Sequence, residues 1–92
     1  MSGKKHVVFI CTYNSVRSQM AEGILRHLYG DRFEVTSAGV APAGVHPMAI
    51  AVLRERGIDI SHQKSRSVMQ LRGQEFEYFV TLSDECKYKC TL

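Results

Sequence analysis

The first 37 residues contain an apolar run, an amphipathic stretch and a second β-prone stretch. Residues 6–10 form a largely apolar run that predicts a buried strand. In residues 18–29 apolar side chains recur at every fourth position, which predicts a helix ending at Gly30. Residues 33–37 alternate in character and are rich in β-prone types, so they predict a second strand.

The middle of the chain predicts a turn-rich loop followed by two helical segments. A helix is expected from Pro47 to Gly57, because proline is tolerated at the first helical position and glycine favours the end of a helix. Ser65 or Ser67 can cap a short further helix that reaches Leu71.

The last part of the chain predicts one more strand and one more turn. Residues 78–82 predict a third strand, and Ser83 or Asp84 can cap a final turn or helix. Strands that alternate with helices indicate one α/β domain, residues 1–92, with a parallel sheet. Function is then expected at the carboxyl ends of the strands, where Cys11 and Ser83 are both placed.

Composition narrows the class of protein. A chain of 92 residues suffices for one small domain, and its net charge of +3 is too slight and too mixed to predict nucleic-acid binding. Its apolar segments are too short for a membrane span or a signal peptide. The odd number of cysteines, three, argues against a secreted disulfide framework. We therefore expect a cytoplasmic protein with reactive thiols and no membrane association.

The most informative local pattern is Cys11, five residues, Arg17 and Ser18, placed between the first strand and the first helix. Unpaired N–H groups at a helix N-terminus stabilise a thiolate and bind tetrahedral anions. An arginine at that point can hold two oxygens of the anion at once. The segment therefore predicts a nucleophile, an anion-binding loop and a clamp. A buried, inert thiol is the alternative.

Residues 11–22, CTYNSVRSQMAE, resemble the active-site loop of the low-molecular-weight protein tyrosine phosphatase superfamily, and within it the thioredoxin-coupled arsenate reductases. The resemblance continues in the family's order through three later segments: Thr36-Ser37-Ala38-Gly39, Gly57-Ile58-Asp59-Ile60-Ser61 and Val80-Thr81-Leu82. It implies a three-layer α/β fold with a parallel sheet in the strand order 2-1-3-4.

In that family the fourth strand, the last helix and an Asp-Pro general acid would follow the point where this sequence stops. The sequence has no Asp-Pro pair, so we expect a chain that is C-terminally incomplete relative to the family. The third strand would then be an exposed edge through which two copies could dimerise.

The resemblance also implies roles for the residues of the loop. The oxyanion would be bound by residues 12–17, which are Thr12, Tyr13, Asn14, Ser15, Val16 and Arg17. The Ser18 hydroxyl would bond the Cys11 sulfur, although Ser18 could also be the N-cap of the helix. Asn14 tolerates left-handed backbone geometry, which would help the loop amides to converge. Tyr13, in place of the phosphatases' glycine, favours the arsenate reductases.

No cofactor and no metal site are expected. Asn14, Glu22 and Ser37 match positions of a potassium site in one arsenate reductase subgroup, but Arg66 stands where an acidic partner is expected and would repel the ion. We therefore expect Glu22 to be an ordinary acid of the first helical turn. The four histidines are scattered without ligand spacing, and His46 is expected to be structural.

Two late cysteines, Cys86 and Cys90, distinguish the candidate functions. In a thioredoxin-coupled arsenate reductase Cys11 would attack arsenate, Cys86 would attack Cys11, and Cys90 would carry the disulfide to thioredoxin. Ser83 stands where the family's middle cysteine usually falls, so the relay would be displaced. A phosphatase acting on phosphate esters would need Cys11 alone. The third alternative is a non-catalytic fragment that binds oxyanions.

Overall fold

The computed structural model describes residues 3–82 and confirms the predicted order of strands and helices. Its elements are β1 (Lys5–Cys11), α1 (Arg17–Tyr29), β2 (Phe33–Gly39), α2 (Pro47–Arg54), the 3₁₀ helix η1 (Val68–Leu71) and β3 (Tyr78–Thr81). The final turn expected after Ser83 or Asp84 lies outside the described residues.

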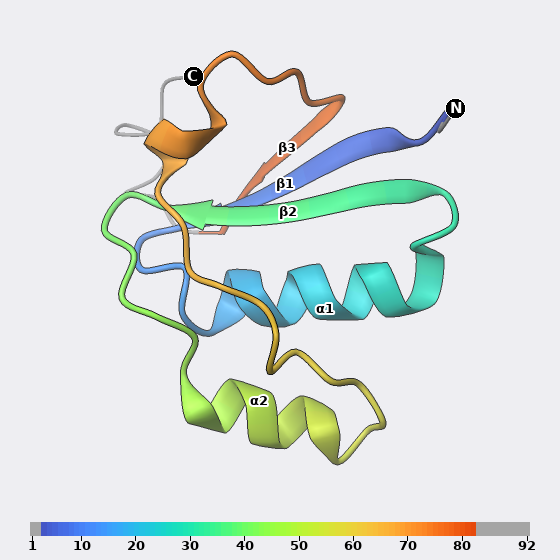
Figure 1. Ribbon diagram of the computed structural model, residues 1–92, viewed down its shortest axis with the longest axis vertical. Helices are drawn as coiled ribbons and strands as arrows, with labels where there is room; N and C mark the ends of the chain where they lie inside the picture. Colours follow the sequence, from blue (N-terminus) through green and yellow to red (C-terminus); the bar gives the residue numbers. More distant parts are fainter. Residues whose placement is uncertain (1–2, 83–92) are drawn as a thin grey trace.

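The three strands form a parallel sheet in the order β2-β1-β3, as expected from the resemblance (Figure 1). β1 is the central strand because it pairs with both β2 and β3, and its apolar Val8 and Ile10 side chains are fully buried there. The sheet brings Cys11, the last residue of β1, level with Gly39, the last residue of β2. Both therefore lie at the carboxyl edge of the sheet.

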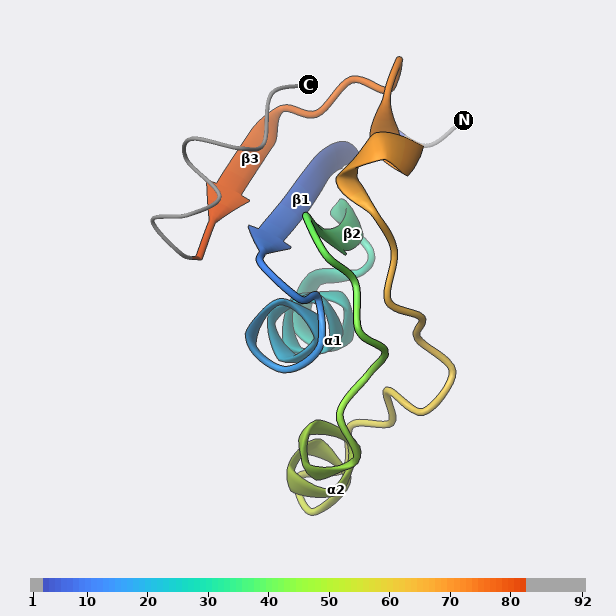
Figure 2. The same ribbon diagram turned by 90° about the vertical axis from the view of Figure 1, so that its left-hand side faces the viewer.

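Helical segments cover both faces of the sheet. α1 lies along one face, α2 packs against the far side of α1, and η1 lies on the opposite face (Figures 1 and 2). One core joins strand residues to η1 and contains Val8, Ile10, Ala38, Val68 and Leu71. A second core joins α2 to the following loop and contains Ala49, Leu53 and Ile60. The three-layer α/β class is confirmed.

The predicted end of α2 was wrong by three residues, although the glycine was identified correctly. Regular helix ends at Arg54, and Gly57 follows in the left-handed region at φ +77°. The Gly57 N–H donates to the Arg54 carbonyl at 3.0 Å and the Ile58 N–H to the Leu53 carbonyl at 2.9 Å. This is the paired-bond pattern with which helices end at a left-handed glycine.

Two other helix termini lie where the sequence predicted them, at Gly30 and at Ser67, and the structure shows how each is formed. Gly30 has φ −63°, so it does not end α1 through left-handed geometry; instead, a Cβ there would lie 2.4 Å from the Arg26 carbonyl oxygen. The short helix before Leu71 is a 3₁₀ turn capped by Ser67, whose hydroxyl accepts from the Met69 N–H at 3.1 Å. Ser65 is not the cap, because its hydroxyl donates to the Tyr13 carbonyl at 3.2 Å.

Candidate active site

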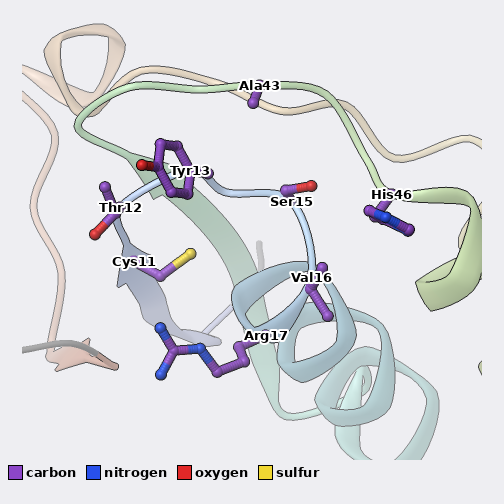
Figure 3. Close-up of a pocket in the computed structure, with 8 residues that line it drawn as sticks. All are labelled: Cys11, Thr12, Tyr13, Ser15, Val16, Arg17, Ala43 and His46. Carbon is purple, nitrogen blue, oxygen red and sulfur yellow. The ribbon is translucent and has the colours of Figure 1, made fainter.

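A cavity of about 510 Å³ opens where β1 runs into α1 (Figure 3). Cys11 lies at its base and is only 4% exposed. The loop residues expected to bind an oxyanion line this cavity, except for Asn14, which is fully buried behind it. The structure therefore brings together the N-terminal site residues proposed from the sequence.

The Cys11 sulfur lies within hydrogen-bond distance of two donors. Ser18 Oγ is 2.9 Å from Cys11 Sγ, and the Asn14 backbone N–H donates to the same sulfur at 3.2 Å. The Asn14 side-chain amide donates to Ser18 Oγ at 2.7 Å. Since the serine oxygen is already accepting, its single proton can be donated to the sulfur.

Ser18 is not the N-cap of α1. The cap is Val16, which makes no side-chain capping bond, and Ser18 lies within the first helical turn with its side chain fully buried. The hydroxyl is committed to the sulfur instead, which excludes the capping alternative.

Asn14 holds the loop in shape from behind. Its φ of +47° lies in the left-handed region, where asparagine is one of the few tolerated side chains. Its Oδ1 accepts from the Arg66 backbone N–H at 2.8 Å and from Gln19 Nε2 at 3.0 Å. Because the Arg66 N–H can only donate, the orientation of the Asn14 amide is fixed.

The carbonyl groups of the loop are tied to the segment that follows β2. The Ala41 N–H donates to the Thr12 carbonyl at 2.8 Å, Ala43 to Tyr13 at 2.9 Å and His46 to Ser15 at 3.0 Å. A trans peptide points its N–H away from its carbonyl. The N–H groups that follow these carbonyls therefore point away from the segment after β2, and that of Asn14 reaches the Cys11 sulfur. Exposed N–H groups of this kind suit an anion.

Ala43 and His46 line the cavity although the sequence analysis did not include them in the site. His46 caps α2, with Nδ1 accepting from the Met48 N–H at 3.0 Å, which fits the structural role expected for it. The signal for this cap was Pro47, since proline favours the first helical position.

Gly39 was part of the resemblance, and the structure supplies the physical reason for a glycine there. A Cβ at this position would lie 2.7 Å from the Thr12 oxygen, 2.8 Å from the Asn14 nitrogen and 2.9 Å from the Cys11 oxygen. β2 can therefore approach the loop this closely only without a side chain.

The Arg17 side chain extends along the same side of the loop as Cys11 (Figure 3). Its Nη1 donates to the Leu82 carbonyl at 2.9 Å, just beyond the end of β3. Arginine carries five N–H donors in a fixed fork, and this bond uses one of them. Arg17 thus connects the anion loop to the chain that follows β3.

Glu22 is not the ordinary first-turn acid expected from the sequence. It is 2% exposed, accepts from Ser37 Oγ and from Arg26 Nη2 at 2.5 Å each, and no acidic residue occurs in the first turn of α1. A carboxylate buried to this degree needs a paired charge, which Arg26 supplies. The expected absence of an alkali-metal site stays a prediction.

Cys86 and Cys90 lie outside the described residues, so their roles are predictions from the sequence. Within residues 3–82 no helix combines the length and apolar character needed to cross a membrane.

The chain is similar in sequence and in structure to proteins named arsenate reductases. The chain is 55% identical over 87 residues to arsenate reductase 1 of Staphylococcus epidermidis, which covers 95% of this chain and 66% of the relative. The structure of a thioredoxin-dependent arsenate reductase of Corynebacterium glutamicum matches with a TM-score of 0.85 and 34% identity, over 97% of this chain and 46% of that one.

A low-molecular-weight protein tyrosine phosphatase from T. tengcongensis matches with a TM-score of 0.73 and 33% identity, over 89% of this chain and 60% of that one. This chain therefore spans about two thirds or less of the length of these relatives. The family model described as low molecular weight phosphotyrosine protein phosphatase matches residues 6–92, and the chain belongs to this family.

Proposed function

We propose that the chain carries the arsenate-reducing site of a thioredoxin-coupled arsenate reductase. The observation that carries this proposal is the Cys11 sulfur, which lies at the base of the cavity with two donors on it and Arg17 beside it. Two further cysteines follow in the sequence, and a reductase needs them whereas a phosphatase does not. Relatives named arsenate reductases support the choice.

In the first proposed step the Cys11 thiolate attacks the arsenic(V) of arsenate, and water leaves. The loop amides and Arg17 hold the oxygens of the anion during this attack. Cys86 then attacks the Cys11 sulfur, the sulfur–arsenic bond breaks, and its electron pair goes to arsenic, which leaves as arsenite. The two sulfurs, now joined as a disulfide, have supplied the two electrons.

The disulfide must then be returned to thiols. In the proposed relay Cys90 attacks Cys86 and releases the Cys11 thiolate, and thioredoxin reduces the resulting Cys86–Cys90 disulfide. This chemistry requires a reducing compartment, so we place the protein in the cytoplasm with a role in arsenical resistance.

The test is arsenate-dependent oxidation of thioredoxin, followed by non-reducing peptide mapping after one turnover. Cys90→Ser is expected to accumulate the Cys11–Cys86 disulfide, whereas Cys86→Ser should release no arsenite. A direct Cys11–Cys90 disulfide in the wild type would show that Cys86 is a bystander. Absence of any arsenate-dependent disulfide would refute the reductase.

Phosphate-ester hydrolysis is the second candidate, and the 33%-identical tyrosine phosphatase structure favours it. The same loop would hold a phosphoryl group while Cys11 attacks it and water later releases phosphate. The Cys86→Ser variant separates the two functions, because it should abolish arsenate reduction and leave ester hydrolysis unchanged.

A further inference from the structure

A continuous chain of side-chain hydrogen bonds runs from the Cys11 sulfur through the interior to Arg26 on α1. We propose that Arg26 is a positioning residue for Cys11 and acts through this chain. The proposal rests on Cys11 as the nucleophile of the proposed function, and it assigns a role to a residue outside the cavity.

In this series of hydrogen bonds, the direction of donation is fixed at the end near the sulfur. The Arg66 backbone N–H holds Asn14 Oδ1, so Asn14 Nδ2 faces Ser18 Oγ and donates to it. Ser18 then has its proton available for the sulfur. Reversing the Asn14 amide would place its oxygen against the serine and its N–H₂ against another donor.

The middle of this series of hydrogen bonds consists of two buried glutamines, Gln19 and Gln63. Gln19 Nε2 donates to Asn14 Oδ1 at 3.0 Å and to the Lys64 carbonyl at 3.0 Å, so Gln19 Oε1 faces the opposite way. There it accepts from Gln63 Nε2 at 2.8 Å. Gln63 Nε2 also donates to the Gln19 carbonyl at 3.0 Å, which fixes the second amide in the same direction.

Arg26 is the first donor in this series of hydrogen bonds. Its Nη1 donates to Gln63 Oε1 at 3.1 Å, and its Nη2 donates to Glu22 Oε2 and to the Val35 carbonyl. A guanidinium has no acceptor, so Arg26 can only donate to Gln63. Every link from Arg26 to Ser18 therefore donates toward the sulfur, and a Cys11 thiolate can only accept from Ser18.

Aligned hydrogen bonds polarise one another, and their effect at the last member exceeds that of a single bond. Among residues 3–82 no buried side-chain nitrogen or oxygen lacks a partner, so the chain is fully connected. Loss of Arg26 would leave Gln63 Oε1 without its donor and Glu22 without its counter-charge. The glutamine and asparagine amides would then be held less firmly in their orientations. As a result, the Ser18 hydroxyl would donate to the Cys11 sulfur in a smaller fraction of molecules.

Arg26 is accessible enough for this idea to be tested by chemical rescue. Its side chain is 40% exposed, and it lines two surface cavities of about 350 and 190 Å³. A guanidinium ion from solution can therefore reach the space that a truncated side chain leaves.

The experiment measures the rate at which iodoacetamide alkylates Cys11 at neutral pH, with peptide mapping to separate it from Cys86 and Cys90. Arg26→Ala is expected to slow alkylation by about threefold or more, as for coupled groups in one network. Millimolar guanidinium should restore the rate, and Arg26→Lys should retain part of it. The control is Arg56→Ala, which removes an exposed arginine from the turn after α2 and should leave the rate unchanged.

Thermal unfolding is followed for each variant, so that the rates are compared on folded protein. A wild-type alkylation rate in Arg26→Ala would overturn the proposal, as would slowing that guanidinium does not relieve. If Arg26→Ala does not fold, Arg26→Lys decides, and a wild-type rate in that folded variant would count against the proposal. Alkylation needs no arsenate, so this result stands apart from the test of arsenate reduction.

Discussion

Gly39 shows how a single residue can control the site without contributing a functional group. A Cβ on this residue, at the end of β2, would lie within 3 Å of three backbone atoms of the anion loop. Gly39→Ala should therefore push the loop out of shape and cost about 1–3 kcal/mol of folding free energy. We expect a large loss of oxyanion affinity, measured by isothermal titration with arsenate or phosphate, together with a lower unfolding midpoint in denaturant.

The matched control is Gly73→Ala. Gly73 has φ +87°, so alanine there costs about 1–2 kcal/mol through left-handed geometry, but a Cβ would meet no atom within 4 Å. We expect Gly73→Ala to lose a similar amount of folding free energy but to bind the anion as tightly as the wild type. If Gly39→Ala binds the anion as tightly as Gly73→Ala does, then Gly39 does not shape the loop.

At the scale of elements, Glu77 fastens the start of β3 to the start of β1. Its carboxylate accepts from the His6 backbone N–H at 2.6 Å, and this bond lowers the pKa of Glu77 from its ordinary value of 4.5. A carboxyl whose pKa is depressed by folding stabilises the protein above its unfolded pKa, and this contribution disappears as the pH falls through the folded value. Glu77→Gln should therefore be less stable than the wild type at pH 7, by urea unfolding, and equally stable in strong acid.

Glu75→Gln serves as the control, because Glu75 is exposed two residues earlier and has the same charge. Its stability difference from the wild type should be small at both pH values. If Glu77→Gln differs from the wild type in stability by the same amount in acid as at pH 7, the carboxylate charge does not account for the stabilising contact between the two strands.

At the scale of the whole molecule, β3 is one of the two edge strands of the sheet within residues 3–82, and Tyr78, Phe79 and Val80 are each at least 36% exposed. Both faces of this strand therefore present apolar surface, and no strand of the described part pairs with its outer side, which favours pairing with a second copy. We expect a concentration-dependent dimer by light scattering, weakened by Phe79→Lys. Met48→Lys, an equally drastic change at an exposed site on α2, should not weaken it. A monomer at every concentration would refute the dimer.

Much of this protein was determined locally and is readable from the sequence. The apolar run before Cys11, the four-residue repeat of α1 and the glycine after α2 each specify a structure through neighbours in the chain. The spacing of Cys11, Arg17 and Ser18 likewise specifies one loop, because a strand and a helix flank it directly. Family resemblance supplied the strand order, which periodicity alone does not contain.

Only the tertiary structure decided how buried polar groups pair across the chain. The bonds Gln19–Gln63, Ser37–Glu22 and Arg26–Gln63 join residues 15 to 44 positions apart, and polar side chains of this kind carry no periodic signal of burial. Glu22 was misread for this reason, because on its own helix it resembles an ordinary solvated acid. Its burial and its bond to Ser37 follow from how α1 packs against β2, which no local pattern records, whereas its pair with Arg26 is an i,i+4 contact within α1.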